Sequence, residues 1–326
     1  MLKDRKYLIL TCDVEAMPDC TDSNHVDRLI YGKVQGAPCP VGVGLMMDIC
    51  DSLGKKMTFF LDVLERNSYG REIDRVAQLI DRRGHDLELH IHAEFALKKF
   101  WEDKGYNAPT WSLNYFDEDS ANILLDHSLK LFKDMVGFLP CAYRAGAFRY
   151  NQFWLKALKS RNIPLSFQYN PVSTIKTSYP HGPDGGILPI FRWSNGIIEV
   201  PTGCLENAAP RNGVARYEDF QSQCMDNTLK YQEFMERYWA YGSEHNVLVM
   251  VLHSWSFLRR DDAGYYYWHN DDYINAFYEF LEQLPANVQV ITARDFLDKI
   301  SCGEIITHFD VPLPFAGPES YPIFSL

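Results

Sequence analysis

The sequence predicts a single-domain α/β protein, an irregular (β/α) barrel, and three observations support this prediction. Short apolar runs alternate with amphipathic segments along most of the 326 residues. Near-continuous apolar runs are typical of parallel strands covered on both faces, and their alternation with helices predicts a parallel sheet with crossover helices. No repeat or linker divides the chain, and 46% apolar residues suffice for one large core.

The first 92 residues follow the order strand, helix, strand, helix, strand. Gly54 and Gly84 each follow a helical pattern, as C-caps do. The stripe of Ile73, Val76 and Ile80 shows the helical period most clearly. The predicted elements are strand 7–12, helix 41–53, strand 56–61, helix 71–83 and strand 87–92.

The rest of the chain continues the alternation with two interruptions. An aromatic excursion covers 95–116, and Asn195-Gly196 predicts a hairpin that an ideal barrel would not contain. We therefore favour an irregular or incomplete barrel over a doubly wound sheet. The further predictions are helix 119–136, strand 141–143, helix 151–160, strand 165–168, loop 170–186, paired strands 187–192 and 196–201, helix 217–241, strand 246–252, helix 272–284, strand 288–292 and helix 293–300. The predicted barrel domain spans 1–308, and 309–326 form a C-terminal tail that we expect to be either poorly ordered or packed over the surface.

Reactive side chains stand at the ends of four predicted strands. They are Asp13 and Glu15, His90 and His92, Arg144, and His253. The carboxyl ends of parallel barrel strands open on one face, where such folds place their sites. Core packing does not explain four apolar strands that end in polar groups, so we expect one shared site.

These residue types suit metal-assisted hydrolysis of an acyl bond. Side chains alternate along a strand, so His90 and His92 share a face. Two imidazoles and one carboxylate give a divalent metal three ligands and leave a position for water. A second carboxylate can act as general base, Arg144 can pair with it, and His253 can protonate a leaving group.

Composition excludes several other functions. The net charge of −11, with no basic block, argues against nucleic acid or an anionic membrane as the main partner. No run reaches the ~18 to 20 apolar residues of a membrane span. The eight scattered cysteines form no CxxC pair, which indicates free thiols of a reducing compartment, so we expect a cytoplasmic protein. The sequence does not predict an oligomeric state.

Four segments resemble motifs of the polysaccharide deacetylase family (carbohydrate esterase family four, chitin deacetylase-like). Thr11-Cys12-Asp13-Val14-Glu15 is similar to the first motif, Thr-Phe-Asp-Asp, and Gly84-His85-Asp86-Leu87-Glu88-Leu89-His90 to the second, Gly-His-Glu-Ile-x-x-His. Arg144-Ala145-Gly146-Ala147-Phe148 loosely resembles Arg-x-Pro-x-Gly, and Val251-Leu252-His253 resembles the fifth motif. The resemblance spans about residues 7–300 and implies a distorted (β/α) barrel of seven strands.

The resemblance also implies roles for individual residues. Asp13 takes the position of the catalytic base, Arg144 that of its partner, and His253 that of the acid. His90 takes the position of the first ligand histidine, and the backbone after Arg144 that of an oxyanion donor. The fourth motif is not found; residues 166–169 are the nearest stand-in.

The chain departs from the family pattern at two of the metal-ligand positions, as a divergent branch would. Val14 stands at the usual metal-aspartate position, so Glu15 replaces it. Glu94 stands where a second histidine is expected, four residues after His90, so either His92 or Glu94 is the third ligand. We favour His92, which shares the strand face with His90, and expect Glu94 to orient a ligand histidine.

The sequence therefore predicts a metal-dependent deacetylase that removes an acetyl group, N-acetyl rather than O-acetyl, from a sugar or polysaccharide precursor. Zn²⁺ is the first expectation for the metal, although the same ligands suit cobalt and nickel. The abundant aromatic residues favour a sugar substrate. Two alternatives remain: an amidohydrolase of the same fold acting on a small non-sugar C–N bond, and a catalytically degenerate barrel that binds glycan.

Overall fold

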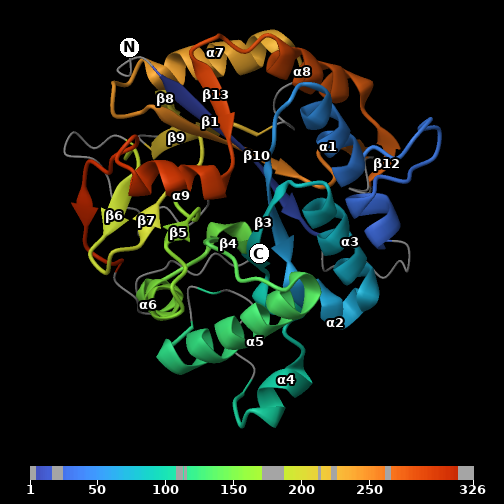
Figure 1. The fold of residues 1–326 in the computed structure, drawn as a ribbon, viewed down its shortest axis with the longest axis vertical. Coiled ribbons are helices and arrows are strands. Elements are labelled where there is room, and N and C mark those ends of the chain that lie inside the picture. The colour runs from blue at the N-terminus through green and yellow to red at the C-terminus, as the bar shows by residue number, and fades with distance from the viewer. Residues whose placement is uncertain are drawn as a thin grey trace.

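The computed structural model describes residues 5–16, 25–107, 113, 116–170, 187–211, 214–221, 226–260 and 266–314. In these segments a curled, mainly parallel sheet is surrounded by helices (Figure 1), and the fold is a distorted (β/α) barrel, as the sequence predicted. No helix within the described segments is both long and apolar enough to cross a membrane.

Strand β1 lies at the centre of the sheet. It pairs in parallel with β10 along its whole length, and its other edge pairs with both β2 and β13. The main sheet has the order β10-β1-β2-β3-β4-β5-β7-β6-β14. Its strands are β1 (Lys6–Val14), β2 (Thr58–Asp62), β3 (Asp86–Ile91), β4 (Ala142–Ala145), β5 (Leu165–Ser166), β6 (Phe191–Trp193), β7 (Ile198–Glu199), β10 (Val247–His253), β13 (Val288–Ile291) and β14 (Asp310–Val311).

Backbone hydrogen bonds of the segment after β7 connect β5 with the edge strand β10. Val200 N donates to Ser166 O at 2.8 Å, and Gly203 N donates to Val249 O at 2.8 Å. The same short segment therefore contacts the end of β5 and the open edge of β10. Glycine is required at 203, because a Cβ there would lie 2.6 Å from the Leu248 side chain and 2.7 Å from Val249 O.

The helices cover the outer face of the sheet (Figure 1). Asn151 caps α6 as expected, since its side chain accepts a hydrogen bond from Trp154 N. The helices are α1 (Val43–Ser52), α2 (Arg66–Tyr69), α3 (Arg71–Arg82), α4 (Lys98–Asp103), α5 (Glu118–Val136), α6 (Gln152–Ser160), α7 (Thr228–Trp239), α8 (Asp271–Glu282) and α9 (Ala293–Ser301), with short turns η1 (Val26–Ile30), η2 (Val63–Glu65), η3 (Ala93–Phe95) and η5 (Gly146–Phe148).

The predicted long helix 217–241 is wrong in its first part. The chain there forms a hairpin of β8 (Cys204–Arg211) and β9 (Val214–Asp219), and α7 begins only after Asn227, which caps it. Phe220 N donates to Gly203 O, and Val251 N donates to Phe220 O. The backbone beside β10 is thus used for sheet pairing, and this tertiary contact overrides the local helical pattern.

Other differences lie at the edges of the barrel. The aromatic excursion contains α4, and a second hairpin, β11 (Leu258–Arg260) with β12 (Tyr266–His269), follows β10 where no strands were predicted. Strand β14 falls within the predicted tail and pairs with β6, because Ser194 N donates to Val311 O at 2.8 Å. The predicted loop 170–186 lies outside the described residues except for Asn170, and the domain boundary at 308 stays a prediction.

The barrel interior is apolar along the strands and becomes polar at their carboxyl ends. Tyr7, Ile9, Phe60, Phe167 and Val249 belong to one buried apolar cluster. Every second residue of a strand faces the same side, so on β1 and β10 the face that carries this cluster ends in titratable side chains at the carboxyl ends. The packed interior therefore supports a polar site at one end of the barrel.

Candidate active site

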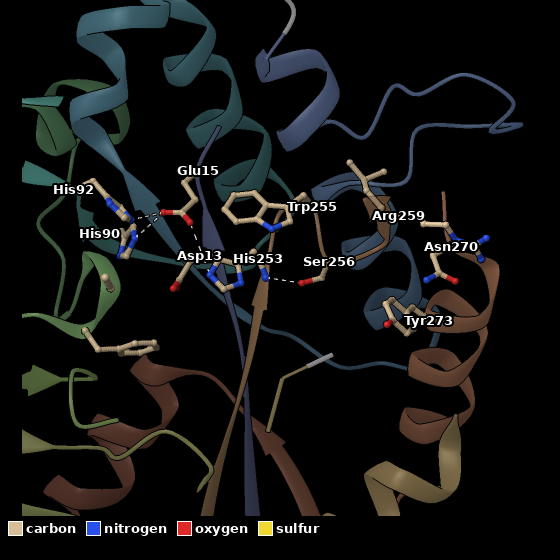
Figure 2. A pocket seen from close by; sticks show the side chains of 13 residues that line it. Asp13, Glu15, His90, His92, His253, Trp255, Ser256, Arg259, Asn270 and Tyr273 are labelled. Atoms are coloured by element: carbon tan, nitrogen blue, oxygen red, sulfur yellow. Dashed lines mark hydrogen bonds and ion pairs between the residues drawn. The ribbon is translucent and has the colours of Figure 1, made fainter. Parts of the chain in front are cut away.

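A pocket of about 570 Å³ opens at the carboxyl ends of β1, β3 and β10 (Figure 2). All five of the predicted titratable side chains, other than Arg144 and Glu94, line it: Asp13, Glu15, His90, His92 and His253. The register of the sheet explains this meeting, because Asp13 pairs with His253 across β1 and β10. Parallel strands place the ends of these chain segments at one level.

Glu15 and the two histidines form the tightest group in the pocket. Glu15 Oε2 lies 2.6 Å from His92 Nε2 and 3.2 Å from His90 Nε2. One ligand atom from each of the three residues lies within 4.8 Å of the others. His90 and Glu15 are buried, and the His92 side chain is 16% exposed, so the group is accessible from the pocket through His92.

The hydrogen bonds of His90 show that this group suits a cation. His90 Nδ1 lies 2.9 Å from the backbone oxygen of Arg144, which can only accept, so Nδ1 carries the proton. In the neutral ring, Nε2 then directs a lone pair at Glu15 Oε2, which also has only lone pairs to offer. A divalent metal or an added proton resolves this repulsion, and two imidazoles with one carboxylate are a ligand set that zinc accepts.

The pKa directions in this group follow from its charges. Burial raises the pKa of Glu15, but the charges on His92 and His90 outweigh it and hold that pKa well below its usual range. Burial lowers the pKa of His92, and the charge and hydrogen bond of Glu15 outweigh it and raise that pKa well above the usual value. Protons on the imidazoles thus balance the carboxylate, as a bound cation would.

Asp13 forms a buried ion pair with Arg144. Its Oδ1 accepts a hydrogen bond from Arg144 Nη1 at 2.7 Å, and the guanidinium also donates from Nη2 to Thr11 Oγ1 at 2.9 Å. Arg144 is fully buried, with its guanidinium carbon 4.4 Å from the centre of the Phe60 ring. The pair holds the orientation of the Asp13 carboxylate.

His253 faces Glu15 from the neighbouring strand, β10. Its Nε2 lies 3.8 Å from Glu15 Oε1, and its ring stacks on Trp255 with centroids 4.7 Å apart. The His253 backbone N–H donates to Ser256 Oγ at 2.8 Å, which steadies the turn after β10. The ring is therefore positioned across the pocket from the Glu15 and histidine group.

Comparisons with known proteins address the fold of this chain. No protein-family model matches it, and no curated protein matches it. Among solved structures, a Mycobacterium smegmatis protein assigned to the polysaccharide deacetylases is 16% identical, with a TM-score of 0.54 and 94% of each chain covered. At the level of the fold, this chain resembles a polysaccharide deacetylase. The family resemblance predicted from the motifs is confirmed at that level.

The deacetylase-like fold is also similar to enzymes of other reactions. A 4-alpha-glucanotransferase from Thermococcus litoralis is 14% identical, with a TM-score of 0.54; 97% of this chain and 42% of that chain are covered. The alpha-amylase AmyC from Thermotoga maritima is 8% identical, with a TM-score of 0.52; 96% and 77% are covered. Fold alone therefore does not select the reaction, and the side chains must do so.

Two further buried acids lie beside the Glu15 and histidine group and were not predicted. Asp62, at the end of β2, accepts from His92 N at 3.0 Å, and Glu65 accepts from Ala16 N at 2.5 Å. Burial raises the pKa of Asp62 to about 7 and that of Glu65 well above its usual value. Asp62 follows an apolar run directly, as Asp13 does, so the strand-end pattern could have identified it.

The turn after β4 brings the chain close to His92. A Cβ on Gly146 would lie 2.7 Å from the His92 ring, so only glycine fits beside it. Ala147 and Phe148 line the pocket and have positive φ values of 50° and 54°. Non-glycine residues in this conformation are strained, and such strain is concentrated at functional sites.

The remaining predicted residues lie further from the pocket centre. Glu94 Oε1 contacts His92 Nδ1 at 2.9 Å, on the ring edge opposite to Glu15. This geometry agrees with an orienting role for Glu94. Ser166 is bonded to the buried Glu199 and does not line the pocket, so residues 166–169 do not supply the missing motif there.

Proposed function

We propose that this chain is a metal-dependent hydrolase that removes an acetyl group, in the first place an N-acetyl group, from a sugar or polysaccharide precursor. One observation supports the proposal above the others. A three-residue ligand set, a buried Asp–Arg pair and an opposing histidine face the same pocket. These are the groups that metal-assisted cleavage of an amide requires.

Glu15, His90 and His92 would bind the metal, with Zn²⁺ as the first expectation. The bound metal would supply Lewis acidity for the acetyl carbonyl and the attacking water. Glu94 and the Arg144 carbonyl orient the two imidazoles through their Nδ1 atoms. Such outer contacts select the tautomer that leaves Nε2 free to ligate.

Asp13 acts as the general base in this proposal. Arg144 engages Oδ1, and no described residue bonds the second oxygen, which is left to accept a proton from water. His253 then donates a proton to the nitrogen as the C–N bond breaks. Water and amide are consumed, and acetate and the sugar amine are released, so atoms and charge balance.

The experiment that tests the proposal measures acetate release and bound metal together. The purified protein is loaded with zinc, and acetate is measured from N-acetylhexosamines, their oligomers and small non-sugar amides. We expect about one metal per chain and acetate release from sugars that stops when a chelator is added. If the protein binds metal but cleaves only the non-sugar amides, the substrate is a small non-sugar amide and not a sugar. Saccharide binding without metal uptake or acetate release would contradict an enzyme and favour a glycan-binding protein.

A further inference from the structure

The pocket continues beyond the catalytic groups to a second wall. Trp255, Arg259, Asn270 and Tyr273 line it there (Figure 2). In the close-up these residues lie to the right, and His90 and His92 lie to the left. The turn after β10, the β11–β12 hairpin and the start of α8 form this wall. The mechanism uses none of these side chains.

Arg259 is the cationic residue of this wall. It is exposed on β11 and lines the pocket, and no described residue forms an ion pair or side-chain hydrogen bond with it. The acids of the same pocket have cationic partners of their own, since Asp13 pairs with Arg144 and Glu15 with the histidines. An unpaired guanidinium in a cavity of a chain with net charge −11 is suited to an anion.

Asn270 adds an unsatisfied hydrogen-bond acceptor. It stands at the N-cap of α8, where asparagine normally accepts from the helix backbone, yet its side chain makes no cap bond. The residue is 8% exposed, and its buried Oδ1 has no partner among the described atoms. An unpaired buried acceptor is costly, and a hydroxyl of a pocket ligand would satisfy it.

The two described acids that follow Asn270 do not occupy this wall. Asp271 and Asp272 begin α8 but are exposed, and neither lines the pocket. Asp271 Oδ2 lies 3.4 Å from His269 Nε2. Trp255 lines the same wall and stacks on His253, so it connects the wall to the catalytic groups.

We propose that this wall binds an anionic group of the substrate, a carboxylate or a phosphate, through Arg259, while Asn270 accepts a bond from a neighbouring hydroxyl. The inference rests on the proposed function and narrows it: the substrate is an acidic acetylated sugar. A carboxylate and a phosphate offer Arg259 the same bidentate oxygen pair, so experiment must separate these two sources.

The test compares three substrates that differ in charge. They are N-acetylglucosamine, its uronic acid and its 1-phosphate. We expect kcat/KM to favour at least one acidic sugar by about 10- to 100-fold, the range typical of a charge-assisted hydrogen bond. In Arg259→Gln this preference falls to about one. Arg71→Gln, which removes an exposed guanidinium of α3 outside the pocket, keeps it. Preference for the uronic acid or for the phosphate identifies the source of the anion.

A second variant tests Asn270. Asn270→Asp is nearly isosteric and retains a side chain suited to an N-cap, but it places a negative charge in the wall. We expect a larger loss of kcat/KM for the acidic sugars than for the neutral one. An equal loss for all three sugars would contradict an anion beside Asn270.

A binding measurement separates this inference from the proposed function. Glucuronate and glucose 1-phosphate are titrated against glucose by calorimetry, which needs no turnover. Suppose that an anionic sugar binds, that Arg259→Gln abolishes the binding, and that no substrate releases acetate. This result would support the proposed anion site and contradict the proposed deacetylase activity. Acetate release with no preference for charge and no effect of Arg259→Gln would contradict the proposed anion site and leave the proposed deacetylase activity unaffected.

Discussion

Both ends of the barrel bury acidic side chains, but the acids at the carboxyl end line a pocket and Glu88 at the amino end does not. At the amino end, Glu88 accepts from Cys141 N at 2.7 Å, from Ala142 N at 2.8 Å and from Arg294 Nη2 at 3.0 Å. At the carboxyl end, Asp13 and Glu15 contact Arg144 and histidines and still face a cavity. Burial of a carboxylate therefore does not identify a reactive site. Unused ligand atoms beside a cavity do.

Histidines on the two ends of β3 show the same contrast. Burial and the nearby charge of Lys56 lower the pKa of His85 to about 4, so this ring is neutral. Burial also opposes the charge on His90, yet Asp13 and Glu15 raise its pKa above the usual value. The pKa of histidine is thus lowered at one end of β3 and raised at the other. The predictions below test whether this division holds.

The largest effect is expected from Asp13→Asn. The amide cannot accept a proton, so kcat should fall by about 10³- to 10⁴-fold, the upper range for a general base. Bound metal should stay near one per chain, because Asp13 is not among the proposed ligands. Acetate release and metal content are measured on the same sample. Retained turnover would show that another group acts as base.

The ligand assignment is tested by His92→Ala beside Glu94→Gln. Loss of a ligand imidazole should weaken zinc binding by more than about 100-fold, beyond the 10- to 100-fold typical of outer contacts. Glu94→Gln should weaken it only within that smaller range, because Glu94 contacts the far nitrogen of His92. Equilibrium dialysis measures both. Stronger loss in Glu94→Gln would reassign the third ligand to Glu94.

At the amino end, Glu88→Ala should affect stability and not catalysis. The change leaves two buried backbone N–H groups and Arg294 without their acceptor, so the free energy of unfolding should fall by about 3 kcal/mol. Urea unfolding measures this, and kcat per folded molecule should not change. A large fall in kcat at unchanged stability would contradict the assignment of a purely structural role to the amino end.

Gly146→Ala probes the tight packing beside His92. The added Cβ would meet the ring at 2.7 Å and displace it, so zinc affinity should fall by about 10-fold. Gly44→Ala in α1 is the matched control, since a Cβ there meets no atom within 4 Å and alanine favours the helix. Equal zinc affinity in both variants would show that the turn yields without moving His92.

The last prediction concerns His85. Its folded-state pKa of about 4 lies below the unfolded value near 6.5, so the unfolded chain takes up the proton first as the pH falls. The contribution is fully present above about pH 6.5 and is lost between that pH and about pH 4. We expect a loss of about 2–3 kcal/mol over this window, reduced in His85→Gln. Denaturation at a series of pH values measures it, and an identical profile in the variant would refute this role.

The strand-end residues were predictable because parallel strands have a distinctive composition. Apolar runs such as 7–12 and 246–252 identified β1 and β10, and the α/β arrangement placed Asp13 and His253 on one face. Helix 217–241 was mispredicted because pairing of Phe220 with Gly203 and Val251 depends on contacts distant in sequence. Local periodicity contains no information on such pairing.

The sequence by itself determined the α/β class, the order of the main elements and the reactive residues at the strand ends, since these depend on local pattern and on the direction of parallel strands. Only the tertiary structure decided which atoms meet. The 2.6 Å contact of Glu15 with His92, the clearance at Gly146 and the wall with Arg259 and Asn270 depend on how separate segments pack. Close packing of the interior determines these distances, and the local sequence pattern alone does not determine them.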